Sequence, residues 1–89
     1  MLTFTITEKL DGYTYATATA DNGAEIDVIV YDASTSDEWI IWVEVDDVRG
    51  VDYDVRSAIM AISYDGYMSI DDALSNVAYR IGKDIEHYC

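Results

Sequence analysis

Apolar and polar side chains alternate along most of the first half of the chain. The alternation covers residues 2–8, 13–20 and 24–31, and each stretch reads as a β-strand with one buried face. Asp11-Gly12 separates the first two strands and Asn22-Gly23 separates the next two. Both dipeptides favour tight hairpin turns, so the three strands are expected to be antiparallel neighbours.

Residues 39–45, Trp-Ile-Ile-Trp-Val-Glu-Val, predict a fourth strand after a polar loop at 32–38. This strand is apolar on both faces and carries both tryptophans. The alternation places these residues on the inner face: Leu2, Phe4, Ile6, Ala16, Ala18, Ala20, Ile26, Val28, Val30, Trp39, Ile41, Val43 and Val45. It places threonines and these residues on the outer face: Tyr13, Tyr15, Glu25, Asp27, Tyr31, Ile40, Trp42 and Glu44.

After residue 50 the apolar period changes from 2 to about 3.6, which is typical of amphipathic helices. The pattern predicts one helix at 53–63, with Asp52 as its N-cap, and a second at 70–87, opened by a capping box that starts at Ser69. Two such helices would cover the inner face. We therefore expect a single acidic α+β domain over residues 1–89: a four-stranded antiparallel β-meander with two C-terminal helices on one face, a ββββαα two-layer sandwich.

Charge sets this chain apart from an ordinary small domain. Its 89 residues carry 18 acidic and 5 basic side chains, a net charge of −13, whereas about 2 to 8 in magnitude is usual. Residues 1–48 hold 11 of the acids and a single base, Lys9. Self-repulsion at this charge destabilises a compact state, so the acidity is expected to have a use.

The predicted outer face suggests what that use is. Glu25 and Asp27 are two residues apart on one strand, so their side chains stand about 6.8 Å apart, close to a multiple of the phosphate spacing of DNA. Aromatic rings beside carboxylates could pack on the stems of Lys and Arg while the carboxylates pair with their charged heads. The predicted partner-binding residues are Tyr13, Tyr15, Glu25, Asp27, Tyr31, Asp32, Asp37, Glu38, Trp42, Glu44, Asp46 and Asp47.

Other kinds of site find little support in the sequence. A net charge of −13 repels phosphates, so no direct binding of nucleic acid is expected. Asp52-Tyr53-Asp54 lacks the later glycine and acid of a calcium loop, and no Cys/His spacing fits a metal, so neither metal nor cofactor is expected. His87 and Cys89 lie at the end of the chain. His87 suits a surface position that compensates the helix dipole, and Cys89 suits an inert thiol, so neither favours an enzyme.

The residues near the two ends of the chain bear on its location. The N-terminal sequence has no basic start and no long apolar run, so neither a secretory signal nor a membrane span is expected. Cys89 is the single cysteine and cannot form an internal disulfide, which favours a reducing compartment. The expected location is the cytoplasm, that of the host cell if the chain is phage-encoded.

These features favour an acidic nucleic-acid mimic that blocks the basic groove of a DNA- or RNA-handling complex. In size, charge and compactness the chain resembles, as a class, the phage-encoded inhibitors of bacterial defence nucleases, such as anti-CRISPR and anti-restriction proteins. One alternative is an acidic interaction module that binds a basic partner without mimicry. Adaptation to salt, or simple solubility, would also explain the acidity. Trp39 is expected in the core, and Trp42 either in an interface or beneath Tyr15 and Tyr31.

Overall fold

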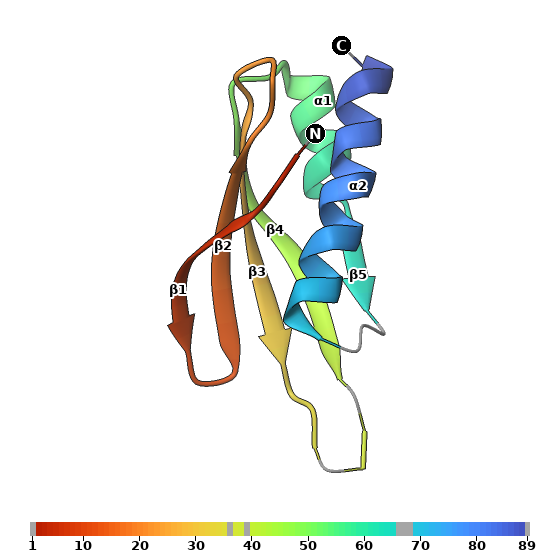
Figure 1. Ribbon diagram of the computed structural model, residues 1–89. Helices are drawn as coiled ribbons and strands as arrows, with labels where there is room; N and C mark the ends of the chain where they lie inside the picture. Colours follow the sequence, from red (N-terminus) through yellow and green to blue (C-terminus); the bar gives the residue numbers. More distant parts are fainter. Residues whose placement is uncertain (1, 36, 39, 66–68, 89) are drawn as a thin grey trace.

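The computed structural model describes residues 2–35, 37–38, 40–65 and 69–88. Its elements, in chain order, are β1 (Thr5–Leu10), β2 (Tyr13–Thr19), β3 (Glu25–Asp32), β4 (Ile41–Arg49), α1 (Tyr53–Met60), β5 (Ser63–Asp65) and α2 (Ile70–Tyr88). The strands form one antiparallel sheet in the order β1-β2-β3-β4-β5, and both helices lie against the same face of it (Figure 1). The predicted four-stranded meander with two covering helices is confirmed, and β5 extends it at one edge.

The core lies between the helices and the middle strands. Along β3, Ile26, Val28 and Val30 are fully buried, whereas the residues between them are exposed or half-buried. α1 packs on β4, and α2 packs on β3 and β4. The buried cluster consists of Ala16, Ala24, Ile26, Val28, Val30, Ile41, Val43, Val45, Val48, Val55, Ile59, Ala73, Leu74, Val77, Ile81 and Ile85.

Strand β4 is longer than the sequence predicts, because a β-bulge carries it past residue 45. Asp27 pairs with Asp47 while Val28 pairs with Val45, so Asp46 is the extra residue that opposes no partner. The bulge shifts the alternation by one position. Val48 therefore enters the core at 2% exposure, and Asp47 and Arg49 join Asp27 and Glu25 on the outer face.

A second bulge changes the first strand, which begins at Thr5 rather than at the predicted residue 2. Ile6 pairs with Ala16 but Glu8 pairs with Tyr15, which leaves Thr7 unopposed. The Thr7 hydroxyl donates a hydrogen bond of 3.3 Å to the Tyr15 carbonyl and fastens the bulge. Leu2 and Phe4 precede the strand and pack against the core as partly buried side chains. The second bulge turns Glu8 to the outer face, since directly paired residues share a face.

The helix boundaries also differ from the prediction at one point. α1 ends at Met60, and β5 then pairs with β4 where the sequence predicts only a helix end and a break. Asp52 occupies the N-cap position of α1, but its side chain makes no capping hydrogen bond. Ser69 acts as predicted, because its hydroxyl accepts the Asp72 amide hydrogen at 3.0 Å. The expected core position of Trp39 lies outside the described residues.

Two glycines give opposite expectations for stability. Gly50 has a φ of +82°, and a Cβ added there would lie 3.1 Å from the Gly23 carbonyl oxygen. Gly82 lies inside α2, and an added Cβ would meet no atom within 4 Å. We predict that Gly50→Ala lowers the free energy of unfolding by about 1–2 kcal/mol, the cost of a left-handed backbone for Ala. Gly82→Ala should raise it by up to about 1 kcal/mol, because Ala is the better helix former.

Urea denaturation of both variants beside the wild type measures the two changes. The substitutions add the same methyl group and alter no charge, so each serves as the control for the other. A stabilising Gly50→Ala, or a destabilising Gly82→Ala, would contradict the backbone geometry at that position.

Candidate functional site

The outer face of the sheet brings together most of the predicted partner-binding residues. The register sets Tyr13, Tyr31 and Trp42 side by side across three strands, and it sets Asp27 beside Asp47 further along. Asp37 and Glu38 lie exposed in the loop between β3 and β4, next to the aromatic end of the face. Asp32 does not join the others. It pairs with Ile41, a core residue, so Asp32 lies on the face of the sheet that the helices cover.

Four aromatic rings form one continuous group, which we call the aromatic cluster: Tyr13, Tyr15, Tyr31 and Trp42. The rings of Tyr31 and Trp42 are stacked, with centroids 5.0 Å apart and planes 13° apart. Tyr13 contacts Tyr31 at a centroid distance of 6.4 Å and Tyr15 edge-on at 6.0 Å. Tyr31 stacks on the Trp42 ring as expected, and the Trp42 side chain stays half-exposed, while its role in an interface remains a prediction.

Carboxylates surround the aromatic cluster, and we call Glu8, Glu44 and Asp46 the outer-face carboxylates. Partial desolvation raises the pKa of the Tyr31 phenol, and the negative charges of Glu44 and Asp46 raise that pKa further. Tyr31 therefore stays neutral at physiological pH. None of the three carboxylates has an ion-pair partner among the residues that the structure describes. The outer face thus combines aromatic surface with uncompensated negative charge.

The other end of the outer face is organised differently, around one guanidinium that we call the Arg49 cluster. Arg49 Nη1 lies 2.7 Å from Asp27 Oδ2 and 2.9 Å from Asp47 Oδ2, and its Nη2 lies 3.1 Å from Glu25 Oε2. Asp47 is also held from α1, because Arg56 Nη2 lies 3.2 Å from its Oδ1. The cluster ties β3, β4 and α1 together.

Hydrogen bonds to Arg49 lower the pKa of both Asp27 and Asp47. Burial opposes the change at each carboxyl, and a 2.8 Å hydrogen bond from the Thr17 hydroxyl adds to it at Asp27. The three carboxylates in turn raise the pKa of Arg49, which keeps its charge throughout. Both aspartates are therefore ionised in the folded protein at any pH near neutrality.

The Arg49 cluster changes how the spacing of Glu25 and Asp27 on β3 is interpreted. The two carboxylates do lie on one face of β3, but they share a cation and do not form a free row of negative charges. The predicted strand at 39–45 ends before Arg49, so the alternation alone does not place this cation on the sheet. The run Val45-Asp46-Asp47-Val48, in which the apolar spacing changes from two residues to three, is the signal that could have revealed the bulge.

The loop between β3 and β4 is fixed by short-range hydrogen bonds. The Asp37 and Glu38 amides both donate to the Thr35 hydroxyl, at 3.3 and 3.2 Å, and the Ile40 amide donates to the Ser34 hydroxyl at 2.8 Å. The Ser34 amide donates to Asp32 Oδ1 at 2.9 Å, so the Asp32 carboxylate is used within the loop. Asp37 and Glu38 therefore extend the negative surface beyond the end of the sheet.

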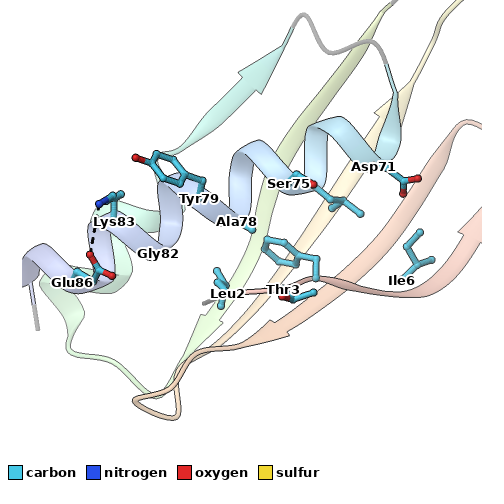
Figure 2. Close-up of a pocket in the computed structure, with 12 residues that line it drawn as sticks. Leu2, Thr3, Ile6, Asp71, Ser75, Ala78, Tyr79, Gly82, Lys83 and Glu86 are labelled. Carbon is cyan, nitrogen blue, oxygen red and sulfur yellow. Dashed lines mark ion pairs between the residues drawn. The ribbon is translucent and has the colours of Figure 1, made fainter.

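A second feature, on the helix side of the molecule, is an open groove of about 900 Å³ between residues 2–6 and α2 (Figure 2). Leu2, Ile6 and Ala78 give it an apolar lining, and Gly82 widens it. The Lys83–Glu86 ion pair, with Nζ and Oε2 4.0 Å apart, lies at one end. No titratable pair converges on its centre in a way that suits acid–base chemistry.

Three further features of the described part of the chain bear on other kinds of site. It contains no group of three or more His, Cys, Asp or Glu side chains placed to hold a metal ion. No helix in it has both the length and the apolar character needed to cross a membrane. His87 is exposed in the last turn of α2, away from the outer face, and Cys89 lies outside the described residues.

Comparison with known proteins identifies no relative, because no protein-family model, curated protein or solved structure matches the chain. The outer face must therefore be interpreted from its own geometry.

The Arg49 cluster gives the protein a specific response to acid. Because both aspartate pKa values are lowered by folding, their contribution to stability is complete above the ordinary aspartate pKa of about 4 and is lost as the pH falls through the folded values. We predict that Arg49→Met melts below the wild type at pH 7 and that this difference narrows as the pH falls from about 4 towards 2.

Arg80→Met is the matched control, since it removes the same charge from a pair on α2 whose Nε and Oδ1 atoms are 3.8 Å apart. It should lower the melting temperature less, with little dependence on pH. Thermal melts followed by circular dichroism across this pH range test both variants. An Arg49→Met difference that is as large at pH 2 as at pH 7 would show that the cluster does not stabilise through these carboxylates.

Proposed function

We propose that this chain is an acidic binding protein that occupies the basic groove of a nucleic-acid-handling partner and excludes nucleic acid from it. One observation carries the proposal: neither helix covers the outer face, which joins the aromatic cluster to carboxylates without cation partners. A sheet fixes the positions of the side chains on its face, which suits an interaction surface. Its aromatic rings supply contact area, and its charge selects a basic partner.

The placement of the cations supports a directional negative field. Four of the five basic residues lie in or near the elements at one end of the molecule: Arg49 ends β4, Arg56 is in α1, and Arg80 and Lys83 are in the C-terminal half of α2. The turn after β1 and the loop after β3 lie at the opposite end, with Asp11, Asp37 and Glu38 (Figure 1). Complementary fields of this strength steer association and exclude partners of like charge.

The surface proposed for mimicry differs from the one that strand spacing alone suggested. Glu25 and Asp27 are neutralised in part by Arg49, so the charges offered to a partner are Glu44 and Asp46 on the sheet and Asp37 and Glu38 in the loop. Under this proposal the partner belongs to the same broad class as the targets of phage-encoded inhibitors, such as a bacterial defence nuclease. The protein would then act in the cytoplasm of the host cell.

A second candidate function is an acidic interaction module that binds a basic protein without imitating nucleic acid. The Arg49 cluster favours it, because it removes the most regular pair of carboxylates from the available surface. The aromatic cluster also favours it, since a phosphate backbone has no counterpart to four packed rings. The two functions differ in whether nucleic acid and this protein compete for one site on the partner.

Competition separates the two candidates. We predict that a partner captured from a bacterial lysate binds nucleic acid, and that added DNA or RNA releases this protein from it in proportion to the nucleic acid bound. Capture should also weaken steeply between low and high salt, since exposed charges are screened within about 8 Å at physiological ionic strength. A ternary complex of partner, nucleic acid and this protein would refute mimicry and leave the second candidate.

Charge reversal tests where the partner binds. We predict that Glu44→Lys with Asp46→Lys weakens partner binding at least tenfold, which corresponds to about 1.4 kcal/mol, because both carboxylates lie at the aromatic cluster. The control is Asp71→Lys with Glu86→Lys on α2, which changes the net charge by the same amount on the helix side and should weaken binding far less. Equal losses in the two double variants, measured by calorimetry, would mean that the acidity acts only as a diffuse field.

A further inference from the structure

We propose that the half-exposed Trp42 indole, stacked on Tyr31 and flanked by Glu44, is a receptor for an arginine side chain of the partner. This inference rests on the proposed function, and it specifies the chemistry that the outer face recognises. It concerns a local site of three side chains and not the overall negative field, which would attract any cation.

The ring pair is held in place by the sheet. Tyr31 and Trp42 are directly paired in the β3–β4 register, and their rings stack with centroids 5.0 Å apart. Tyr13 supports Tyr31 from the β2 side at 6.4 Å. Because three strands fix these rings, little side-chain freedom remains to be lost when a ligand packs on them. The site is thus organised before a partner arrives.

The carboxylate of Glu44 completes the site. Glu44 follows Trp42 by two residues on the same face of β4, about 6.8 Å along the strand. It lies near enough to Tyr31 for its charge to raise the pKa of that phenol. A guanidinium packed on the indole could therefore also donate to Glu44, which combines a cation–π contact with a charge-assisted hydrogen bond.

Among the residues that the structure describes, the recorded cation contacts lie elsewhere. Arg49 and Arg56 are engaged with Glu25, Asp27 and Asp47, and Lys83 lies over the Tyr79 ring at 5.5 Å. Among the described residues, no cation lies over a ring of the aromatic cluster. Tyr79 thus contacts a lysine of its own helix, whereas the half-exposed Trp42 indole has no such cation among the described residues.

The geometry selects arginine over lysine. A guanidinium is planar, so it can lie flat on an aromatic face while its edge donates two hydrogen bonds to a carboxylate. An ammonium is a compact, strongly hydrated charge that has neither a planar face to stack on the ring nor a fork that matches a carboxylate. Basic grooves that bind phosphates are rich in arginine for the same bidentate geometry, so a partner of the proposed kind would supply the side chain.

Two model peptides test the inference without a purified partner: a capped hexa-arginine and a capped hexa-lysine of equal charge. Binding is measured by calorimetry at low salt. We expect the wild type to bind the arginine peptide at least fivefold more tightly than the lysine peptide. Trp42→Leu should reduce this preference to less than twofold and leave lysine binding nearly unchanged, because the field is intact. Trp42→Phe should retain an intermediate preference, since a smaller ring remains.

Tyr79→Leu is the control, because it removes an exposed ring from α2 on the other side of the molecule. It should leave the arginine preference unchanged. Equal affinity of the wild type for the two peptides, or a preference that survives Trp42→Leu, would overturn the inference. Circular dichroism confirms that each variant is folded, and Trp42→Phe decides the case if Trp42→Leu is not.

The peptide experiment and the competition experiment can fail separately. If the captured partner competes with nucleic acid but binds Trp42→Leu as well as the wild type, the arginine site is wrong and the proposed function stands. If the arginine preference depends on Trp42 but the partner binds nucleic acid and this protein together, the site stands and mimicry fails.

Discussion

The strict alternation of buried and exposed side chains in the three middle strands is the constraint on which this structure depends. Two helices can cover only one face of the sheet, so alternate residues of β2, β3 and β4 are turned towards them, and the buried ones are apolar except for Thr14. In β4, which has nine residues, the bulge at Asp46 shifts the alternation by one position and so keeps its apolar residues on the covered face. With the bulge, Val48 packs under α1 and the cation of Arg49 stays in solvent contact on the other face.

The same bulge changes how the charge of the molecule is distributed. Along the sequence, the first 48 residues contain nearly all the excess acid and one base, which suggests a uniformly negative sheet. In space, the sheet gains Arg49 from its own fourth strand and Arg56 from the helix packed beside it. The negative surface is consequently divided: at one end of the outer face two arginines neutralise most of the charge of three carboxylates, and the other end presents aromatic rings and carboxylates without ion-pair partners among the described residues. Charge counted along a chain is a poor guide to charge on a face.

The elements that could be predicted are those in which local and tertiary preferences agree. The turns at Gly12 and Gly23, the alternation of β3 and the long apolar stripe of α2 each specify one structure. The outer-face positions of the tyrosines and Trp42 follow directly from that alternation. The acidic positions on β3 were also placed correctly, although their neutralisation was not foreseen.

What could not be predicted depends on pairing between distant segments. A bulge is a property of two strands, so neither Thr7 nor Asp46 signals one alone, and the outward position of Glu8 and the Arg49 cluster were missed as a result. β5 forms because three residues after α1 pair with the edge of β4, and the local sequence pattern does not indicate this pairing. Asp32 was placed with the interface because a loop residue has no face until its strand partner is known.

The bulge at Thr7 also has a consequence for the solubility of a sheet with one uncovered side. β1 is an edge strand, and an edge offers unsatisfied backbone groups to which a strand of another molecule could add. A bulge interrupts the regular spacing of those groups, and the charged side chains of Glu8 and Lys9 follow it immediately. At the opposite edge, β5 has only three residues and offers little length for pairing. The bulge on β1 and the shortness of β5 are both features by which sheet proteins make strand addition at an edge less favourable.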